Sequence, residues 1–152
     1  MSTSSSAPQL SSLLARVRTT LEARGLFSGA RRVMVACSGG PDSQVLLHAL
    51  WSLRDQHRCA LIAATVDHGL RPEAASEAAP VRALAAELEL EFVGLSVEVA
   101  QGASLQARAR EARYAALLSC AAGQGAERVA VGHTLDDQAE TVLARLLRGA
   151  GL

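Results

Sequence analysis

Residues 33–43 read VMVACSGGPDS, a short apolar run followed directly by a Gly-rich turn. The β-branched apolar residues of Val33–Cys37 predict a buried strand, and the apolar spacing over Asp42–Leu53 predicts a helix behind the turn. Gly39 and Gly40 allow backbone conformations and close approaches that a Cβ atom would forbid. Such a strand–turn–helix unit leaves free N–H groups at the start of the helix, which favours an anionic ligand there.

The alternation of strands and helices continues through the chain. An amphipathic helix is expected over Leu10–Leu26, ending near Gly25. Other strands are expected at Cys59–Val66, Glu91–Val99 and Val129–Gly132, and other helices at Pro72–Leu90, at 104–122 capped by Ser104, and at Leu135–Arg148. This pattern of βαβ units predicts an α/β fold, a parallel sheet with helices on both faces.

The predicted order leaves no strand after the last helix, so one edge of the sheet would be unprotected. We therefore expect a chain truncated before its fifth strand, the alternative being a natural four-stranded domain. Residues 1–9 are expected to be a disordered N-terminus, and residues 10–152 a single domain. The inward face of the second helix is expected to consist of Val45, Leu46, Ala49, Leu50 and Leu53, and the core stripe of the third of Val81, Leu84, Ala85 and Leu88.

Composition excludes several mechanisms. The 15 basic residues are all Arg and balance 15 acidic ones, so no overall basic field indicates a nucleic-acid binder. Without Lys, neither a Walker-type P-loop nor a Schiff-base enzyme is possible. Cys37, Cys59 and Cys120 form no C-x-x-C pair and are expected to be free thiols in a reducing compartment. No apolar run approaches the roughly 20 residues of a membrane span, and no secretion signal is visible, so a cytoplasmic protein is expected.

Asp42 is the unexpected residue of the turn. A carboxylate beside bound phosphates requires a cation between them, so we assign Asp42 to Mg²⁺. The hydroxyls of Ser38 and Ser43 are expected to add donors to the anion site. The alternative is an ordinary tight turn in which Asp42 is the N-cap of the helix.

The hexad Ser38–Ser43, SGGPDS, resembles the S-G-G-x-D-S PP-loop of the ATP-pyrophosphatase superfamily. Three further stretches add to it: DHGLR at Asp67–Arg71, REARY at Arg110–Tyr114 and GHTLDDQAET at Gly132–Thr141. Each also has a simpler interpretation, because Arg110 could lie on a solvated helix face, His68 in a surface turn, and Asp136 at a helix cap. In this order, from Arg32 to Leu152, they resemble the tRNA(Ile)-lysidine synthetase family.

This resemblance implies an adenine nucleotide α-hydrolase-like, Rossmann-like fold, with 10–152 as the PP-loop catalytic domain and the C-terminal tRNA-binding domains absent. It implies a ligase that uses ATP and Mg²⁺ to join free L-lysine to C2 of the wobble cytidine of a tRNA(Ile) with a CAU anticodon. The reaction would pass through an adenylated intermediate and release pyrophosphate and AMP. A homodimer is one assembly that the family resemblance allows.

The resemblance also implies residue roles. ATP would be bound by Ser38, Gly39, Gly40, Pro41, Asp42, Ser43 and His133, with adenine near Ala36 and Val66. Catalysis would fall to His133, Asp137 and Arg113, and the metal to Asp42 and Asp137. His133 would contact phosphate or carry a proton, and Asp137 would hold Mg²⁺ or deprotonate the lysine ammonium. Two alternatives remain: a PP-loop tRNA thiolase, and a non-catalytic ATP-binding module.

Overall fold

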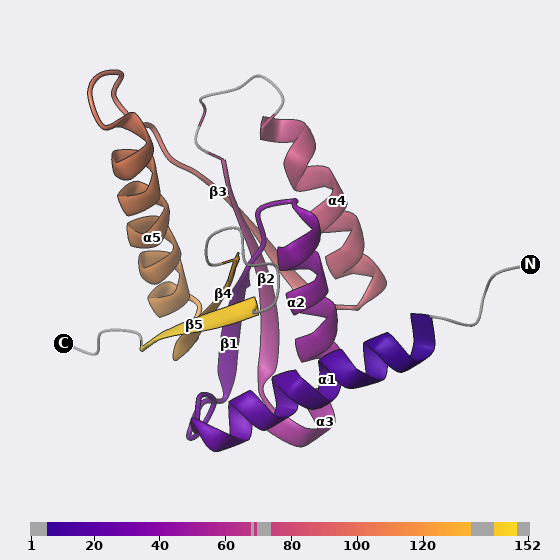
Figure 1. Ribbon diagram of the computed structural model, residues 1–152. Coiled ribbons are helices and arrows are strands. Elements are labelled where there is room, and N and C mark those ends of the chain that lie inside the picture. Colours follow the sequence, from indigo (N-terminus) through magenta and orange to yellow (C-terminus); the bar gives the residue numbers. More distant parts are fainter. Residues whose placement is uncertain (1–5, 68, 70–73, 135–141, 149–152) are drawn as a thin grey trace, which may run out of the picture.

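A computed structural model describes residues 6–67, 69, 74–134 and 142–148 (Figure 1). The helices are α1 (Ser6–Ala23), α2 (Pro41–Ser52), α3 (Arg54–His57), α4 (Ala74–Glu87) and α5 (Leu105–Gly123). The strands are β1 (Arg32–Ala36), β2 (Ala60–Asp67), β3 (Glu91–Ser96), β4 (Arg128–Thr134) and β5 (Val142–Arg148). None of the helices in these ranges has the length and apolar character that a bilayer crossing requires.

The strands form one sheet in the order β3-β2-β1-β4-β5, with β1 at its centre. The strands β1 to β4 pair in parallel, with Val35 opposite Ala63 of β2 and Ala130 of β4. The chain passes from β1 to β2 and β3 in one direction, and then returns to place β4 on the other side of β1. This reversal is the topological switch point at which open α/β sheets bind ligands. The predicted parallel α/β fold is confirmed.

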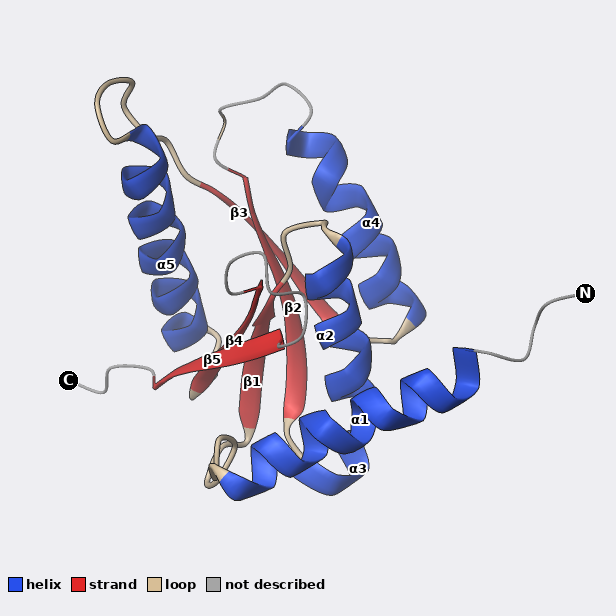
Figure 2. Ribbon diagram, in the orientation of Figure 1, coloured by secondary structure: helices blue, strands red, loops and turns tan. Residues whose placement is uncertain are grey.

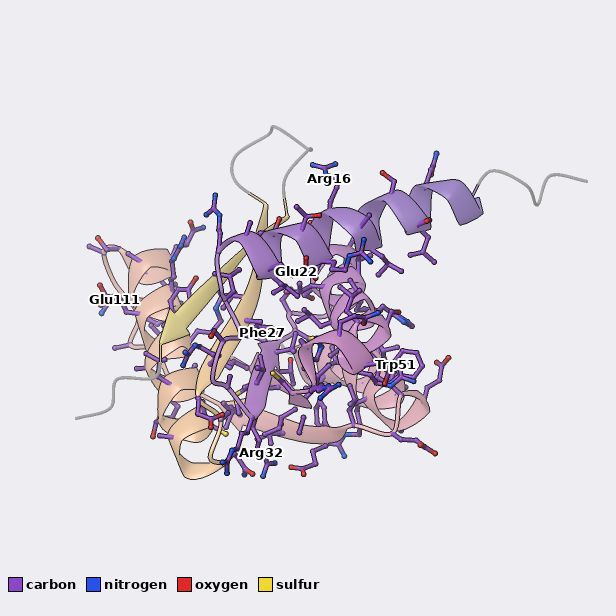
Figure 3. All side chains as sticks on the ribbon, turned by 90° about the horizontal axis from the view of Figure 1, so that it is seen from below. Arg16, Glu22, Phe27, Arg32, Trp51 and Glu111 are labelled. Atoms are coloured by element: carbon purple, nitrogen blue, oxygen red, sulfur yellow. The ribbon has the colours of Figure 1, made fainter. Side chains whose placement is uncertain are left out.

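Helices cover both faces of the sheet (Figure 2). Alternate residues of β1 point to opposite faces, as in any strand. Val33 and Val35 belong to the core beneath α1, α2 and α4, whereas Met34 belongs to the core beneath α5, where it meets Leu117 and Ala121. Seen from below the molecule, Phe27 lies on the side of α1 that faces the core containing Val33 and Val35, and Arg16 lies on the outer side of α1 (Figure 3).

The start of α1 and the cap of α5 differ from the prediction. The first helix begins at Ser6, so residues 6–9 are helical rather than disordered, and it ends before Gly25, whose φ is 57°. Ser104 occupies the N-cap position of α5 as predicted, but its φ of 60° is left-handed and its side chain makes no cap hydrogen bond. A capping side chain normally requires an extended backbone at that position, which Ser104 lacks.

The inward face of α2 is rotated slightly from the one predicted. Val45 is 41% exposed, whereas Leu47, absent from the predicted face, is fully buried. The buried face is centred on Leu46, Leu47 and Leu50, at the spacing of adjacent helical turns. The core stripe predicted for the following helix is correct, since Val81, Leu84, Ala85 and Leu88 of α4 and its C-terminal turn are all buried.

The prediction of a last helix over Leu135–Arg148 is wrong for the part that the structure describes, residues 142–148. Val142–Arg148 forms β5 and pairs antiparallel with β4, with Gly132 opposite Ala144. The sheet thus has a fifth strand, although not the parallel one that a helical crossover would deliver. The apolar spacing of this segment suits a helix, but the free N–H and C=O groups along β4 favour strand pairing. The remainder of the predicted helix, 135–141, lies outside the described residues.

The rotated face of α2 can be tested with two substitutions on the same helix. Leu47→Ala should lower the free energy of unfolding by about 2–5 kcal/mol, because it leaves a cavity in a closed core. Val45→Ala should cost about 0.5 kcal/mol or less, because its side chain is largely in solvent. Urea unfolding of both variants measures the difference, and equal losses would contradict the burial assigned here.

Candidate functional site

A cavity of about 180 Å³ opens at the C-terminal ends of β1, β2 and β4, beneath α5. It lies at the switch point of the sheet, between β1 and its neighbours β2 and β4. Figure 1 shows the turn from β1 into α2 and the helix α5, which both border this region. Its lining comprises Ala36, Cys37, Ser38, Ser43, Ala64, Val66, Arg113, Leu117, Val131 and Gly132.

One wall of the cavity is apolar. Ala36, Ala64 and Val66 come from β1 and β2, and Leu117 faces them from α5. Such small side chains leave room for a flat ring between the sheet and the helix. Ala36 and Val66, the two residues predicted to lie near adenine, therefore lie in one cavity. Ala64 was missed, although it precedes Val66 by two residues and so shares its face of the strand.

The other wall is the turn between β1 and α2, whose shape depends on Ser43. The Cys37 N–H donates to the Ala64 carbonyl at 2.7 Å and prolongs the sheet pairing. The Ser43 Oγ accepts the Ser38 N–H at 3.1 Å and donates to the Gly40 carbonyl at 3.1 Å. Ser43 is only 3% exposed. Its single hydroxyl hydrogen is thus used inside the turn, and it could donate to a ligand only after this bond breaks.

The turn presents free backbone donors. In the described part of the chain, no acceptor engages the N–H groups of Gly39, Gly40, Asp42 or Ser43, while Pro41 has no N–H. Gly39 adopts a φ of 82°, a left-handed conformation that favours glycine. The donors converge at the N-terminus of a 12-residue helix, whose dipole also favours negative charge. The arrangement is suited to a phosphate chain.

Arg113 supplies a positive charge to the same cavity. Its side chain is half-buried, and its Nε is buried without a hydrogen-bond partner among the described residues. Its guanidinium carbon also lies 5.5 Å from the centre of the Tyr114 ring. A buried N–H without an acceptor destabilises the protein unless a ligand supplies one. Arg113 is therefore poised for an anionic partner, whereas Arg110 is exposed.

Asp42 is not the N-cap of α2. The cap position is Gly40, and Asp42 lies in the first turn of the helix, exposed and without a side-chain partner among the described residues. No group of three His, Cys, Asp or Glu residues in the described ranges could enclose a metal ion. Mg²⁺ commonly binds through one or two carboxylates together with substrate phosphates, so a lone exposed carboxylate beside the turn fits that mode.

Several predicted residues cannot be placed as side chains. His133 belongs to β4 opposite Leu143 of β5, but its side chain lies outside the described ones. Asp136, Asp137, Glu140 and Thr141 lie wholly outside the described residues, as do His68, Leu70 and Arg71. In the DHGLR stretch, the Asp67 carboxylate accepts the Gly69 N–H at 2.7 Å. This bond fixes the course of the chain where it leaves β2 near the cavity.

The cysteines are free, as predicted. Cys37 lines the cavity but is only 2% exposed, and burial raises the pKa of its thiol to about 12. Burial is also the main cause that raises the pKa of the Cys59 and Cys120 thiols. Because the thiolate is the nucleophilic form, none of these thiols is activated in this structure.

Residues 7–152 match the family model of the PP-loop domain, and the chain belongs to this family. It is 46% identical over 91% of its length to a tRNA(Ile)-lysidine synthase of Symbiobacterium thermophilum, and 48% identical over 86% to one of Rhodopseudomonas palustris. The chain spans 30% and 40% of the lengths of these curated relatives.

Solved structures show the same fold at low sequence identity. The U34-tRNA thiolase NcsA of Methanococcus maripaludis matches with a TM-score of 0.70 at 19% identity, over 86% of this chain and 48% of that one. An NH3-dependent NAD synthetase of Campylobacter jejuni matches with a TM-score of 0.56 at 16% identity, over 79% of this chain and 53% of that one.

Arg113 provides a direct test of the anion site. Arg113→Gln should weaken binding of α,β-methylene-ATP roughly tenfold to a hundredfold, the range expected for losing a charge-assisted hydrogen bond. It should lower the melting temperature no more than Arg110→Gln does, because both guanidinium groups lie at a similar distance from the Tyr114 ring, 5.5 and 5.6 Å. Arg110→Gln, on the exposed face of the same helix, is the matched control for calorimetric titration. Equal affinities of both variants and the unmodified chain would exclude Arg113 from the site.

Proposed function

We propose that this domain binds ATP for a tRNA(Ile)-lysidine synthetase, in which lysine is joined to the wobble cytidine of tRNA(Ile). The observation that carries this proposal is the identity of 46–48% over 86–91% of the chain to proteins of that name. The intact phosphate turn and the cavity beside it support the same function. The cytoplasm, where ATP, tRNA and free lysine occur together, is the proposed location, and the homodimer remains a prediction.

The cavity suggests how ATP would lie. Adenine would occupy the apolar wall formed by Ala36, Val66 and Leu117. The phosphates would extend toward the free N–H groups of Gly39 and Gly40 at the start of α2. Arg113 lines the same cavity and would meet the phosphates from the opposite side, on α5. This placement satisfies both the unpaired Nε of Arg113 and the free backbone donors.

The proposed chemistry has two displacements. The C2 carbonyl oxygen of cytidine would attack the α-phosphorus, forming a C–O–P linkage while the bond from the α-phosphorus to the pyrophosphate oxygen breaks. Negative charge then develops on pyrophosphate, where the N–H groups of the turn and Arg113 would stabilise it. In the second step the lysine amine attacks C2, and the C2–O bond breaks to release AMP.

The lysine ammonium must lose a proton before it can attack. His133, near the end of β4, or Asp137, which follows β4 in the sequence, would accept it, as their chemistry allows. Asp42 and Asp137 would hold Mg²⁺. When bound, Mg²⁺ neutralises charge on the phosphates and on the leaving pyrophosphate.

The thiolase alternative is disfavoured by the cysteines. A sulfur carrier requires an accessible thiolate, but Cys37, next to the phosphate turn, is buried and its pKa is raised to about 12 by that burial. The similarity to a solved thiolase is at 19% identity and concerns the fold. An ATP-sensing module is disfavoured by the carboxylates that follow His133 in the sequence, Asp136, Asp137 and Glu140, since a site that only binds a polyanion gains nothing from several of them.

The proposed function is tested with the protein expressed from its complete reading frame. Pyrophosphate release should require tRNA(Ile) with a CAU anticodon, and labelled lysine should enter that tRNA with release of AMP. Asp42→Ala should abolish pyrophosphate release without lowering the melting temperature, because the side chain is exposed. ATP cleavage that needs no tRNA, or modified tRNA without lysine, would overturn the proposal.

Cys37→Ala separates the two tRNA-modifying alternatives in the same assay. The synthetase predicts unchanged lysine incorporation in this variant. The thiolase predicts ATP binding without tRNA modification, and sulfur rather than lysine in the product of the unmodified protein.

A further inference from the structure

Gln44 makes a contact to the phosphate turn that lies outside the SGGPDS hexad. It is the fourth residue of α2, is half-buried, and its Nε2 donates to the Gly39 carbonyl at 2.9 Å. The backbone N–H of Gln44 meets the next carbonyl, that of Gly40, at a longer 3.4 Å. The side chain therefore holds the turn more closely than the helix backbone does at this point.

The Gly39 carbonyl needs such an anchor. Glycine crosses between backbone conformations more freely than any other residue, and Gly39 is already in the left-handed region at a φ of 82°. In the described part of the chain, no other donor engages this carbonyl. Without Gln44, the peptide that joins Gly39 to Gly40 could rotate and turn its oxygen toward the anion site.

The orientation of the Gly39–Gly40 peptide decides whether a ligand in the anion site faces its N–H donor or its carbonyl oxygen. A trans peptide is planar, so its C=O and N–H point in opposite directions. When Gln44 holds the Gly39 oxygen on the side of α2, the Gly40 N–H must point away from that side chain. This N–H is among the free donors of the turn, and the following carbonyl, that of Gly40, is held by the Ser43 hydroxyl.

We propose that Gln44 is a positioning residue for phosphate binding, which fixes the Gly39–Gly40 peptide so that the Gly40 N–H faces the polyphosphate of ATP. The inference rests on the proposed function and adds to it a residue outside the hexad. Gln44 acts through the backbone and makes no contact with the nucleotide. Its effect should therefore be confined to the phosphate part of the affinity.

Gln44→Met tests this role, because it keeps the length of the side chain and removes the amide donor. Gln44→Glu is a second variant, which keeps polarity but offers only acceptors at neutral pH. Calorimetric titration of the chain with α,β-methylene-ATP should show affinity lowered roughly three- to tenfold, the loss expected for one hydrogen bond. Adenosine affinity, followed by NMR, should not change, and Gln56→Met on α3 should leave both affinities unaltered.

A second readout is the amide resonance of Gly40 in ¹H–¹⁵N spectra. In the unmodified chain it should move downfield when α,β-methylene-ATP is added, and in both Gln44 variants this shift should be smaller. Unchanged affinity and an unchanged Gly40 shift in the variants would overturn the role of Gln44 alone. Equal weakening of adenosine and of the triphosphate, with a lower melting temperature, would also overturn it by showing a general structural role. An unmodified chain that does not bind the analogue would contradict the proposed function itself.

Discussion

The Ser43 hydroxyl bridges the two ends of the turn between β1 and α2, and the candidate site depends on this bridge. It accepts from the Ser38 N–H and donates to the Gly40 carbonyl, so the chain leaves the strand and enters the helix within a few residues. Because Ser43 is buried, water competes little for these bonds. The turn is thereby built from its own polar groups, and its remaining N–H groups are left for a ligand.

The rest of the fold provides the surroundings that make this turn useful. The β1 strand is the central strand and is buried on both faces, so the turn starts from a rigid base. The α5 helix packs on the sheet through Leu117 and Ala121. One turn before Leu117, Arg113 reaches the C-terminal edge of the strands and meets the cavity. Apolar surface, free backbone donors and one arginine thus meet at the switch point, the combination that an adenine nucleotide requires.

The central part of the site could be predicted because its signals are local. The strand before Ser38, the glycines and the helix after them follow from short-range pattern and backbone sterics, whereas Ala36 and Val66 came from the family resemblance. Features that depend on contacts between distant segments could not be predicted from the sequence. Periodicity alone favoured Val45 over Leu47 for the buried face of α2, since only the packed sheet decides the rotation of a helix. The apolar residues of 142–148 have helical spacing, yet this segment pairs as a strand with the otherwise unpaired edge of β4. The bond from Gln44 to Gly39 depends on turn geometry that composition does not reveal.

The chain contains a second cavity, of about 310 Å³, beneath α1, lined in part by Leu21, Phe27 and Leu53. It also borders His57, whose ring nitrogens are both engaged by backbone groups, the Leu50 carbonyl and the Cys59 N–H. This second cavity is on the face of the sheet opposite to α5 and is larger than the one at the phosphate turn. A further cavity of about 400 Å³ lies along α1 and is larger still. Volume therefore does not identify the ligand site, whereas the free backbone donors, Arg113 and the switch point favour the turn.

The most direct measurement is therefore a ¹H–¹⁵N titration of the chain with α,β-methylene-ATP, which reports on both cavities at once. Our account predicts that the large shifts fall on the amides of 37–44, with smaller ones near Val66, Arg113 and Gly132. Shifts centred on Phe27 and His57, with the amides of 37–44 unmoved, would contradict it.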